Sequence, residues 1–241
     1  MSNPQQKLSL NINAWMANSS GLSTPQDWQA WADKQIWPEN GDIDASAIPA
    51  MMRRRMSTLS KLAVQTAVSL LQRNDIDYIV FSSRHGELHR SIKLVSDILA
   101  GEEASPMAFS QSVHNTAAGL ATIATKQPIP LTSIAAGDNT FQSALLDAWL
   151  YLAENPHHKV LLVDFDEPLP PHYQTFETMD YLGFSLGLIL SAGEQFSMTA
   201  YPAENDTAIL PQGLSFLRQF LTGQTQWIIQ APRQNWVWQR Q

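Results

Sequence analysis

Leu131-Thr-Ser-Ile-Ala-Ala-Gly-Asp-Asn-Thr140 opens the part of the chain that decides its fold class. Residues 131–136 are apolar or small and predict a buried strand, which the following glycine ends. Residues 140–153 then carry apolar side chains at a helical spacing, and Lys-Val-Leu-Leu-Val-Asp at 159–164 predicts a second buried strand. A strand, a helix and another strand in this order are typical of an α/β fold with a central sheet.

Similar patterns on both sides of this stretch predict further elements of the same fold. Residues 183–191 and 196–201 are expected to form two adjacent strands joined at Ala192-Gly-Glu194. A helix is expected at 87–99, with four apolar residues on one face. The other expected strands are 8–16, 77–83 and 226–230, and the other expected helices are 54–72, 112–125 and 214–221.

The segment 17–49 shows no clear period, contains several prolines and glycines, and is expected to be irregular. It also holds Trp28, Trp31 and Trp37. Because tryptophan buries a large apolar area, we expect these side chains to attach the segment to the body of the protein or to a partner.

Length and composition exclude several classes of protein. The chain has 241 residues, of which 44 % are apolar, and no internal repeat or linker, so residues 1–241 are expected to form a single domain. Its net charge of −7 argues against a nucleic-acid binder. Without any cysteine it has no disulfide, thiolate metal site or cysteine nucleophile. No signal peptide and no apolar run of membrane-spanning length is visible, so a cytoplasmic location is expected.

The histidines give no strong signal for a metal or a cofactor. His85 and His89 are spaced four residues apart at the start of the helix expected at 87–99, so both could face one ion. A third ligand is missing from the pattern, and zinc proteases carry a glutamate beside the first histidine that is absent here. We therefore expect no metal and no cofactor.

Two polar positions leave alternatives open. At the start of the helix expected at 112–125, Ser112 or Asn115 could be the cap and His114 a satisfied interior or interface side chain. Asp138 or Asn139 could likewise cap the next helix. Alternatively, His114 and Asp138 could belong to a hydrolytic site, because a helix N-terminus after a sharp turn is where many folds place a nucleophile. The sequence shows no basic partner for Asp138.

Three consecutive cations, Arg53-Arg-Arg55, are expected at the start of the helix at 54–72. Cations are unfavourable at that end of the helix dipole. The run is therefore either a solvated surface or a site for an anion such as a carboxylate, a phosphopantetheine phosphate or an acidic carrier protein.

Three segments in order carry a resemblance to a known family. They are Arg53-Arg-Arg-Met-Ser-Thr-Leu-Ser60, Ser83-Arg-His-Gly-Glu-Leu88 and Ser105-Pro-Met-Ala-Phe-Ser-Gln-Ser-Val-His-Asn115. Together they resemble the ketoacyl-synthase-like N-terminal domain family of the thiolase fold, over about residues 53–190. The resemblance implies a mixed central sheet with helices packed on it, limited to the N-terminal half of that fold.

The same resemblance implies that the chain has no catalytic nucleophile. The run Ser133-Ile-Ala-Ala-Gly-Asp138 matches the family's strand before its cysteine, so Asp138 stands at the cysteine's position. The family's two catalytic histidines lie in the second half of the fold, which the chain is too short to contain. Such degenerate members resemble chain-length factors, including those of aryl polyene biosynthesis. These pair with a full-length β-ketoacyl synthase as a heterodimer and act on chains carried by acyl carrier protein.

In that interpretation, residues 105–119 face the acyl tunnel of the partner. The residues expected in the tunnel or interface are Met107, Phe109, Gln111, Ser112, His114, Asn115, Asp138 and Phe141. Half a thiolase fold would also expose an apolar surface, which the tryptophan-rich ends of the chain and a partner could cover. Two other functions stay open: a stand-alone acyl- or carrier-binding module that uses Arg53, Arg54 and Arg55, and a small hydrolase or acyltransferase that uses His114 and Asp138.

Overall fold

A seven-stranded mixed sheet forms the centre of the computed structural model, which describes residues 7–203 and 208–241. The strands are β1 (Lys7–Ser19), β2 (Tyr78–Ser82), β3 (Leu131–Ile134), β4 (Lys159–Asp166), β5 (Phe184–Pro202), β6 (Gln226–Ile229) and β7 (Gln234–Arg240). Their order is β3-β2-β4-β5-β7-β6, and β1 also pairs with β5. The strands β3, β2 and β4 are parallel, and the other pairs are antiparallel.

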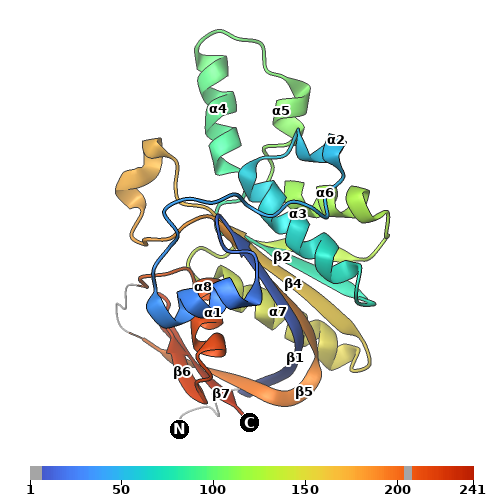
Figure 1. The fold of residues 1–241 in the computed structure, drawn as a ribbon, viewed down its shortest axis with the longest axis vertical. Coiled ribbons are helices and arrows are strands. Elements are labelled where there is room, and N and C mark those ends of the chain that lie inside the picture. Colours follow the sequence, from blue (N-terminus) through green and yellow to red (C-terminus); the bar gives the residue numbers. More distant parts are fainter. Residues whose placement is uncertain (1–6, 204–207) are drawn as a thin grey trace.

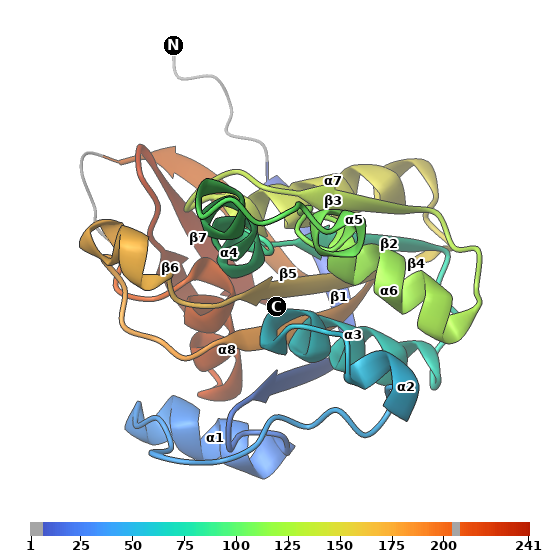
Figure 2. The ribbon, with the colours of Figure 1, turned by 90° about the horizontal axis from the view of Figure 1, so that it is seen from above.

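Helices cover both faces of this sheet (Figures 1 and 2). They are α1 (Pro25–Lys34), α2 (Ala50–Arg53), α3 (Thr58–Leu71), α4 (Leu88–Leu99), α5 (Pro106–Ser110), α6 (Thr116–Thr125), α7 (Thr140–Glu154) and α8 (Gln212–Leu221), with a 3-10 turn at Pro171–Phe176. Alternate residues of each strand enter different cores, because side chains alternate across a strand. Val80 and Leu162 pack with α7 and α8, whereas Phe81 and Val163 pack with α3 and α6.

The N-terminal segment contains a helix, α1, and the prediction that 17–49 is irregular was wrong in this part. The side chain of Thr24 accepts a hydrogen bond from the backbone N–H of Asp27, and Asp27 accepts one from the backbone of Thr24. This reciprocal pair is a capping box, and Pro25 is well suited to the first helical position. Trp28 and Trp31 are buried as expected, and Trp37 packs against them.

The C-terminal part differs from the prediction in two ways. The two strands expected at 183–191 and 196–201 are one continuous strand, β5, which pairs with β4 through its first half and with β7 through its second. Ala192-Gly-Glu194 therefore lies within the strand, and Asn11 of β1 occupies the space beside Gly193 where a larger residue would need room. The strand β7 was not predicted, because its apolar run, Trp236-Val-Trp238, is only three residues long.

The helix α4 does not bury the apolar face that its pattern predicts. Leu94 is buried, but Val95, Ile98 and Leu99 are exposed by 54 %, 48 % and 82 %. Figure 1 shows why: α4 and α5 form a hairpin that extends away from the sheet. The helix expected at 112–125 begins later, at Thr116, and is preceded by the separate helix α5.

Candidate functional site

The carboxyl ends of the three parallel strands bring a set of polar side chains together. β2 leads into Ser83 and Arg84, β4 ends at Asp166, and β3 leads through a turn into Asp138. Open α/β sheets bind ligands at the carboxyl ends of their parallel strands, so this is the first place to look for a site.

Arg84 is the centre of this cluster. Its Nε donates to Oδ2 of Asp166 at 2.9 Å, and its backbone N–H donates to the other carboxylate oxygen at 3.0 Å. Its Nη2 donates to the hydroxyl of Tyr181 at 2.5 Å, and its Nη1 lies 3.2 Å from the sulfur of Met179. The side chain is 7 % exposed. Arg84 thus attaches the loop that contains Met179 and Tyr181 to the end of the sheet.

The charges of this cluster depend on each other. Burial raises the pKa of Asp166, although the guanidinium of Arg84 opposes that rise. Burial alone would lower the pKa of Arg84, but Asp166 holds it above its ordinary value. The pKa of Tyr181 is raised by burial and by the negative charge of Asp166. Arg84 and Asp166 are therefore an ion pair with a neutral tyrosine, and removal of either partner would leave an uncompensated buried charge.

Asp138 has a basic partner that the sequence did not reveal. Its Oδ1 lies 3.7 Å from Nη1 of Arg84, and its side chain is 42 % exposed. The turn before it needs the positive φ of Gly137, which is 56°. Asn139, one of the two predicted caps, holds the N-cap position of α7, but no side-chain hydrogen bond caps that helix. Asp138 is thus an exposed carboxylate beside a buried cation.

His114 does not join this carboxylate. Its Nε2 donates to the carbonyl of Ser83 at 2.8 Å. The Oγ of Ser83 in turn accepts from the backbone of Gly86, which has a φ of 55° and lies against the His114 ring. His85 is the histidine in the field of Asp138, although burial, acting first, lowers its pKa. The part of the chain that the structure describes shows no hydrogen bond between His114 and Asp138.

Comparison with known proteins identifies the family behind this geometry. The model for the N-terminal domain of β-ketoacyl synthases matches residues 28–239. The chain belongs to this family. It is 34 % identical to a chain in the structure of the ketosynthase ApeO in complex with its chain length factor ApeC from Xenorhabdus doucetiae, with a TM-score of 0.89. That match covers 97 % of this chain and 100 % of the other.

More distant structures share the fold alone. The ishigamide ketosynthase/chain length factor matches with a TM-score of 0.64 and 14 % identity, over 80 % of this chain and 67 % of that one. A β-ketoacyl synthase from Burkholderia phymatum matches with a TM-score of 0.59 and 12 % identity, over 92 % and 71 %. No curated protein matches the chain. The expected fold, the N-terminal half of a thiolase-like ketosynthase, is confirmed.

A second polar cluster in this ketosynthase-like chain surrounds Glu87, which is 3 % exposed. The hydroxyls of Ser57 and Ser60, at the start of α3, donate to its Oε1 at 2.7 and 2.5 Å. Its other oxygen lies 3.3 Å from Nε of Arg90. Arg90 also donates to the side chain of Gln111 and, at 2.7 Å, to the backbone carbonyl of Arg55. This cluster therefore joins the start of α3 to α4 and to the segment 105–119.

The predicted tunnel residues fall into three groups. Met107 and Phe109 are exposed by 55 % and 64 %, on the hairpin. Gln111 and His114 are half-buried and hydrogen-bonded as described, and the carbonyl of Ser112 accepts from Ser91 at 3.0 Å. Phe141 is buried in the core, where its ring lies 5.4 Å from that of Phe216.

Of the two caps predicted for the helix at 112–125, Asn115 was right in position and Ser112 was wrong. Asn115 precedes α6 but makes no side-chain capping bond, and the Oγ of Ser112 donates to the carbonyl of Phe109 at 2.9 Å. The position of the arginine run was also wrong, because Arg53 is the last residue of α2, where a cation is favourable. Its Nη1 donates to the carbonyl of Ala45 at 3.2 Å. Arg54 and Arg55 are exposed in the turn before α3.

Metal and membrane sites find no support in the described residues. Within 7–203 and 208–241, no group of three or more histidine, aspartate or glutamate side chains could hold a metal ion. His89 instead donates to the carbonyl of Pro168 at 2.9 Å. None of the helices in these ranges has the length and apolar content needed to cross a bilayer.

The sequence missed Arg84, Asp166 and Tyr181. Arg84 follows β2, Asp166 ends β4, and Tyr181 lies in the loop after β4. The sequence signal was therefore present as polar residues at the carboxyl ends of β2 and β4. Their meeting depends on the parallel pairing of those strands, in which Ser82 lies opposite Asp164.

Proposed function

We propose that this chain is a non-catalytic subunit that pairs with a full-length β-ketoacyl synthase, in the manner of a chain-length factor. The observation that carries the proposal is the presence of an aspartate, Asp138, at the nucleophile's position beside Arg84. The chain contains no cysteine, and the family resemblance assigns this position to the nucleophile. A carboxylate beside the buried guanidinium of Arg84 is a weak nucleophile, because the cation stabilises its negative charge.

The shape of the molecule supports a partner on the side of β3. This strand ends the sheet, and its four residues are all half-exposed. An unpaired edge strand is a ready template for pairing with another chain. Near it, α5, α6 and the segment between them expose Phe109, Ile123 and Val113 by 64 %, 63 % and 40 %. A ketosynthase is a suitable partner, because the structure of ApeO with ApeC, to which this chain is similar, is a complex of a ketosynthase with its chain length factor.

The surface charge of the same region favours an acidic carrier protein as a further ligand of the complex. Residues 45–74 and 104–137 contain no aspartate or glutamate, although the net charge of the chain is −7. A surface hollow of about 510 Å³ lies beside Arg53, Arg54 and Lys61, with Asp42 at its edge. We propose that an acyl carrier protein approaches this hollow when the synthase is bound.

The first test is co-expression with the full-length synthase encoded nearest to this chain, followed by affinity capture and native mass measurement. A stable one-to-one complex is expected. Phe109→Glu should abolish it, because the substitution places a charge in an apolar contact, whereas Leu99→Glu on the outer end of α4 is the matched control for an exposed apolar residue. A monomeric chain that ignores the synthase would contradict the proposal.

The second test separates a silent subunit from a hydrolase or acyltransferase. Asp138→Asn and His114→Ala should leave product formation by the complex within about twofold, because neither residue contacts a reacting atom in the proposed role. If the isolated chain turns over acyl thioesters and either substitution abolishes that turnover, the enzymatic alternative is correct.

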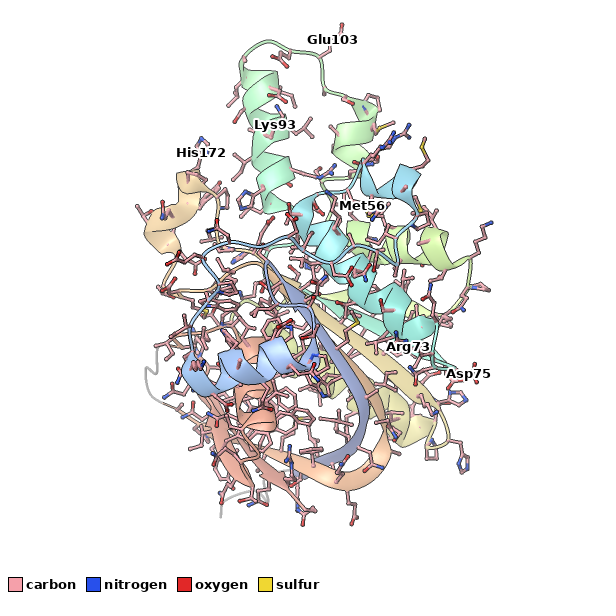
Figure 3. The ribbon with its side chains drawn as sticks, in the orientation of Figure 1. Met56, Arg73, Asp75, Lys93, Glu103 and His172 are labelled. Carbon is pink, nitrogen blue, oxygen red and sulfur yellow. The ribbon has the colours of Figure 1, made fainter. Side chains whose placement is uncertain are left out.

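Carrier binding has its own test. Arg54→Glu should weaken carrier binding to the complex and reduce its salt dependence, because exposed charges are screened at high ionic strength. Arg73→Glu, an exposed arginine at the far end of α3 (Figure 3), is the control with the same change in charge. Equal effects of both substitutions would indicate only long-range attraction.

A further inference from the structure

The three consecutive arginines do not serve one surface. Arg53 and Arg54 border the hollow that also contains Lys61, whereas Arg55 borders a different pocket of about 310 Å³. The turn between α2 and α3 separates the two. Figure 3 shows Met56, which lines the second pocket, at this turn and beside α5 and α6.

The second pocket, here called the methionine pocket, has an apolar interior. It is lined by three methionines, Met51, Met52 and Met56, and by two aliphatic residues of α6, Leu120 and Ile123. Met56 is 7 % exposed and Met51 is 70 % exposed, so the lining extends from the core to the surface. Methionine is unbranched and polarisable, and it adapts to ligands of different shape.

The rim of the methionine pocket is polar and offers hydrogen-bond donors. Its polar lining residues are Arg55 and Gln111, and no aspartate or glutamate lines it. Within the described residues, the guanidinium of Arg55 makes no hydrogen bond or ion pair. The Oε1 of Gln111 accepts from Arg90, which leaves its Nε2 amide as a free donor.

Part of this rim is held in place by Arg90. Arg90 contacts both of its members, through the side chain of Gln111 and the backbone carbonyl of Arg55. Arg90 is itself fixed by the buried carboxylate of Glu87. The side chain of Gln111 is therefore positioned before a ligand binds, whereas the guanidinium of Arg55 has to be ordered by the ligand itself.

We propose that the methionine pocket binds a carboxylate carried on a short apolar chain. The carboxylate pairs with the guanidinium of Arg55 and accepts from Gln111, and the chain enters between Met56 and Ile123. An arginine–carboxylate contact is among the stronger hydrogen-bonded pairs. The volume lies at the lower end of the range for small-molecule sites, which suits a chain of roughly six to ten carbon atoms.

This assignment stands independently of the proposed pairing with a synthase. The test uses the isolated full-length chain labelled with ¹³C at its methionine methyl groups and titrated with octanoate. The methyl signals of Met52 and Met56 are expected to shift in a saturable way, while those of Met179 and Met198, elsewhere in the chain, stay unchanged. Octanol and octylamine serve as probes of the same length without a negative charge.

Two substitutions locate the contacts. Arg55→Gln should weaken octanoate binding about tenfold and leave octanol binding unchanged, because it removes one charge-assisted contact. Ile123→Glu, at an exposed position, should abolish the binding of octanoate by placing a negative charge in the pocket. Arg54→Gln is the matched control and should change neither affinity.

The outcomes are distinct. Octanoate, octanol and octylamine binding with equal affinity, or equal losses in Arg54→Gln and Arg55→Gln, would overturn the carboxylate assignment. Methionine signals that do not move with octanoate would overturn the pocket itself. If octanoate binds and is then displaced by the synthase, the pocket is confirmed and lies within the interface. Failure to capture the synthase would leave octanoate binding unaffected.

Discussion

The two faces of the sheet differ in how completely the chain covers them. On the face of α7 and α8, aromatic residues from both ends of the chain close the core: Trp28 and Trp31 of α1 are buried, and Trp227 and Trp238 stack at 5.7 Å. On the face of α3 and α6, the inner layer is buried, but Val113 and Ile123 remain exposed by 40 % and 63 %.

Segments from both ends of the chain cover the face of α7 and α8. The N-terminal helix α1 packs against α8, and the strands β6 and β7 extend the sheet beside them. The tryptophan-rich ends of the chain thus lie over one face of the sheet. On the other face Val113 and Ile123 stay exposed, although the covered face also exposes Leu150 of α7, by 53 %.

The largest expected effect comes from truncating a core residue on the face of α7 and α8, here called the closed face. Trp28→Ala should lower the free energy of unfolding by about 3–5 kcal/mol, because it removes a fully buried ring and leaves a cavity. Urea denaturation of the isolated chain measures this. Trp28→Phe should cost much less, because it retains part of the ring packing and removes an indole N–H that has no partner among the described residues. Equal losses in both variants would contradict the packing explanation.

A buried acid on the closed face gives an effect that depends on pH. Burial raises the pKa of Asp164 from 3.8 to about 8, with a further rise from Asp166. Ser82 and Arg84 oppose this rise, and from α8 the backbone of Gly213 lies against the carboxyl group. The folded chain therefore keeps a proton that the unfolded chain releases near pH 4.

The stability of the wild type should accordingly fall as pH rises between about 4 and 8, relative to Asp164→Asn. The relative change is at most about 1.4 kcal/mol per pH unit, or about 2–3 kcal/mol from pH 5 to pH 7. Urea denaturation at pH 5, 6 and 7 measures it, with the exposed Asp75→Asn as control. Parallel curves for wild type and Asp164→Asn would show that Asp164 is ionised in the fold.

The smallest effect on stability is expected on the other side of the sheet, at the exposed Phe109 of α5. Phe109→Ser should change the free energy of unfolding by less than about 0.5 kcal/mol, because the ring is already 64 % exposed. The same substitution should weaken capture of the synthase. Its effect on binding should therefore exceed its effect on stability, whereas Trp28→Ala acts on stability. A loss of several kcal/mol in the isolated chain would mean that the two faces are equally closed.

The elements that the sequence predicted well are those with an uninterrupted local pattern. The strand β4 and the helix α7 were found because their apolar residues are continuous or periodic. The strand β5 was divided in two because Gly193 and its neighbours look like a turn, whereas a contact with Asn11 of β1 makes a small residue necessary there. Contacts between distant segments leave no local pattern.

The candidate site was predicted in part for the same reason. Asp138 was placed correctly at the end of a strand and turn, because Gly137 marks that turn within the local sequence. Its partner Arg84 lies in a different strand–loop unit, and only the parallel pairing of β2 with β3 brings them together. The sequence placed the apolar residues of α4 on one face, but it did not show that the hairpin projects from the sheet and leaves much of that face exposed.

The pairing of β1 with β5 has a consequence for the order of events during synthesis. Leu8 of β1 pairs with Met198, and the side-chain amide of Asn11 donates to the backbone carbonyl of Ala192, 181 positions further along the chain. A ribosome adds about 5–20 residues per second, so β1 has no partner strand for roughly ten seconds or more. Throughout this interval the nascent chain displays an unpaired strand and the tryptophans of α1, and contacts so distant in sequence also form slowly. A chaperone or a nascent synthase that binds during this interval would therefore contact β1 and the tryptophans of α1 before the core has formed around them.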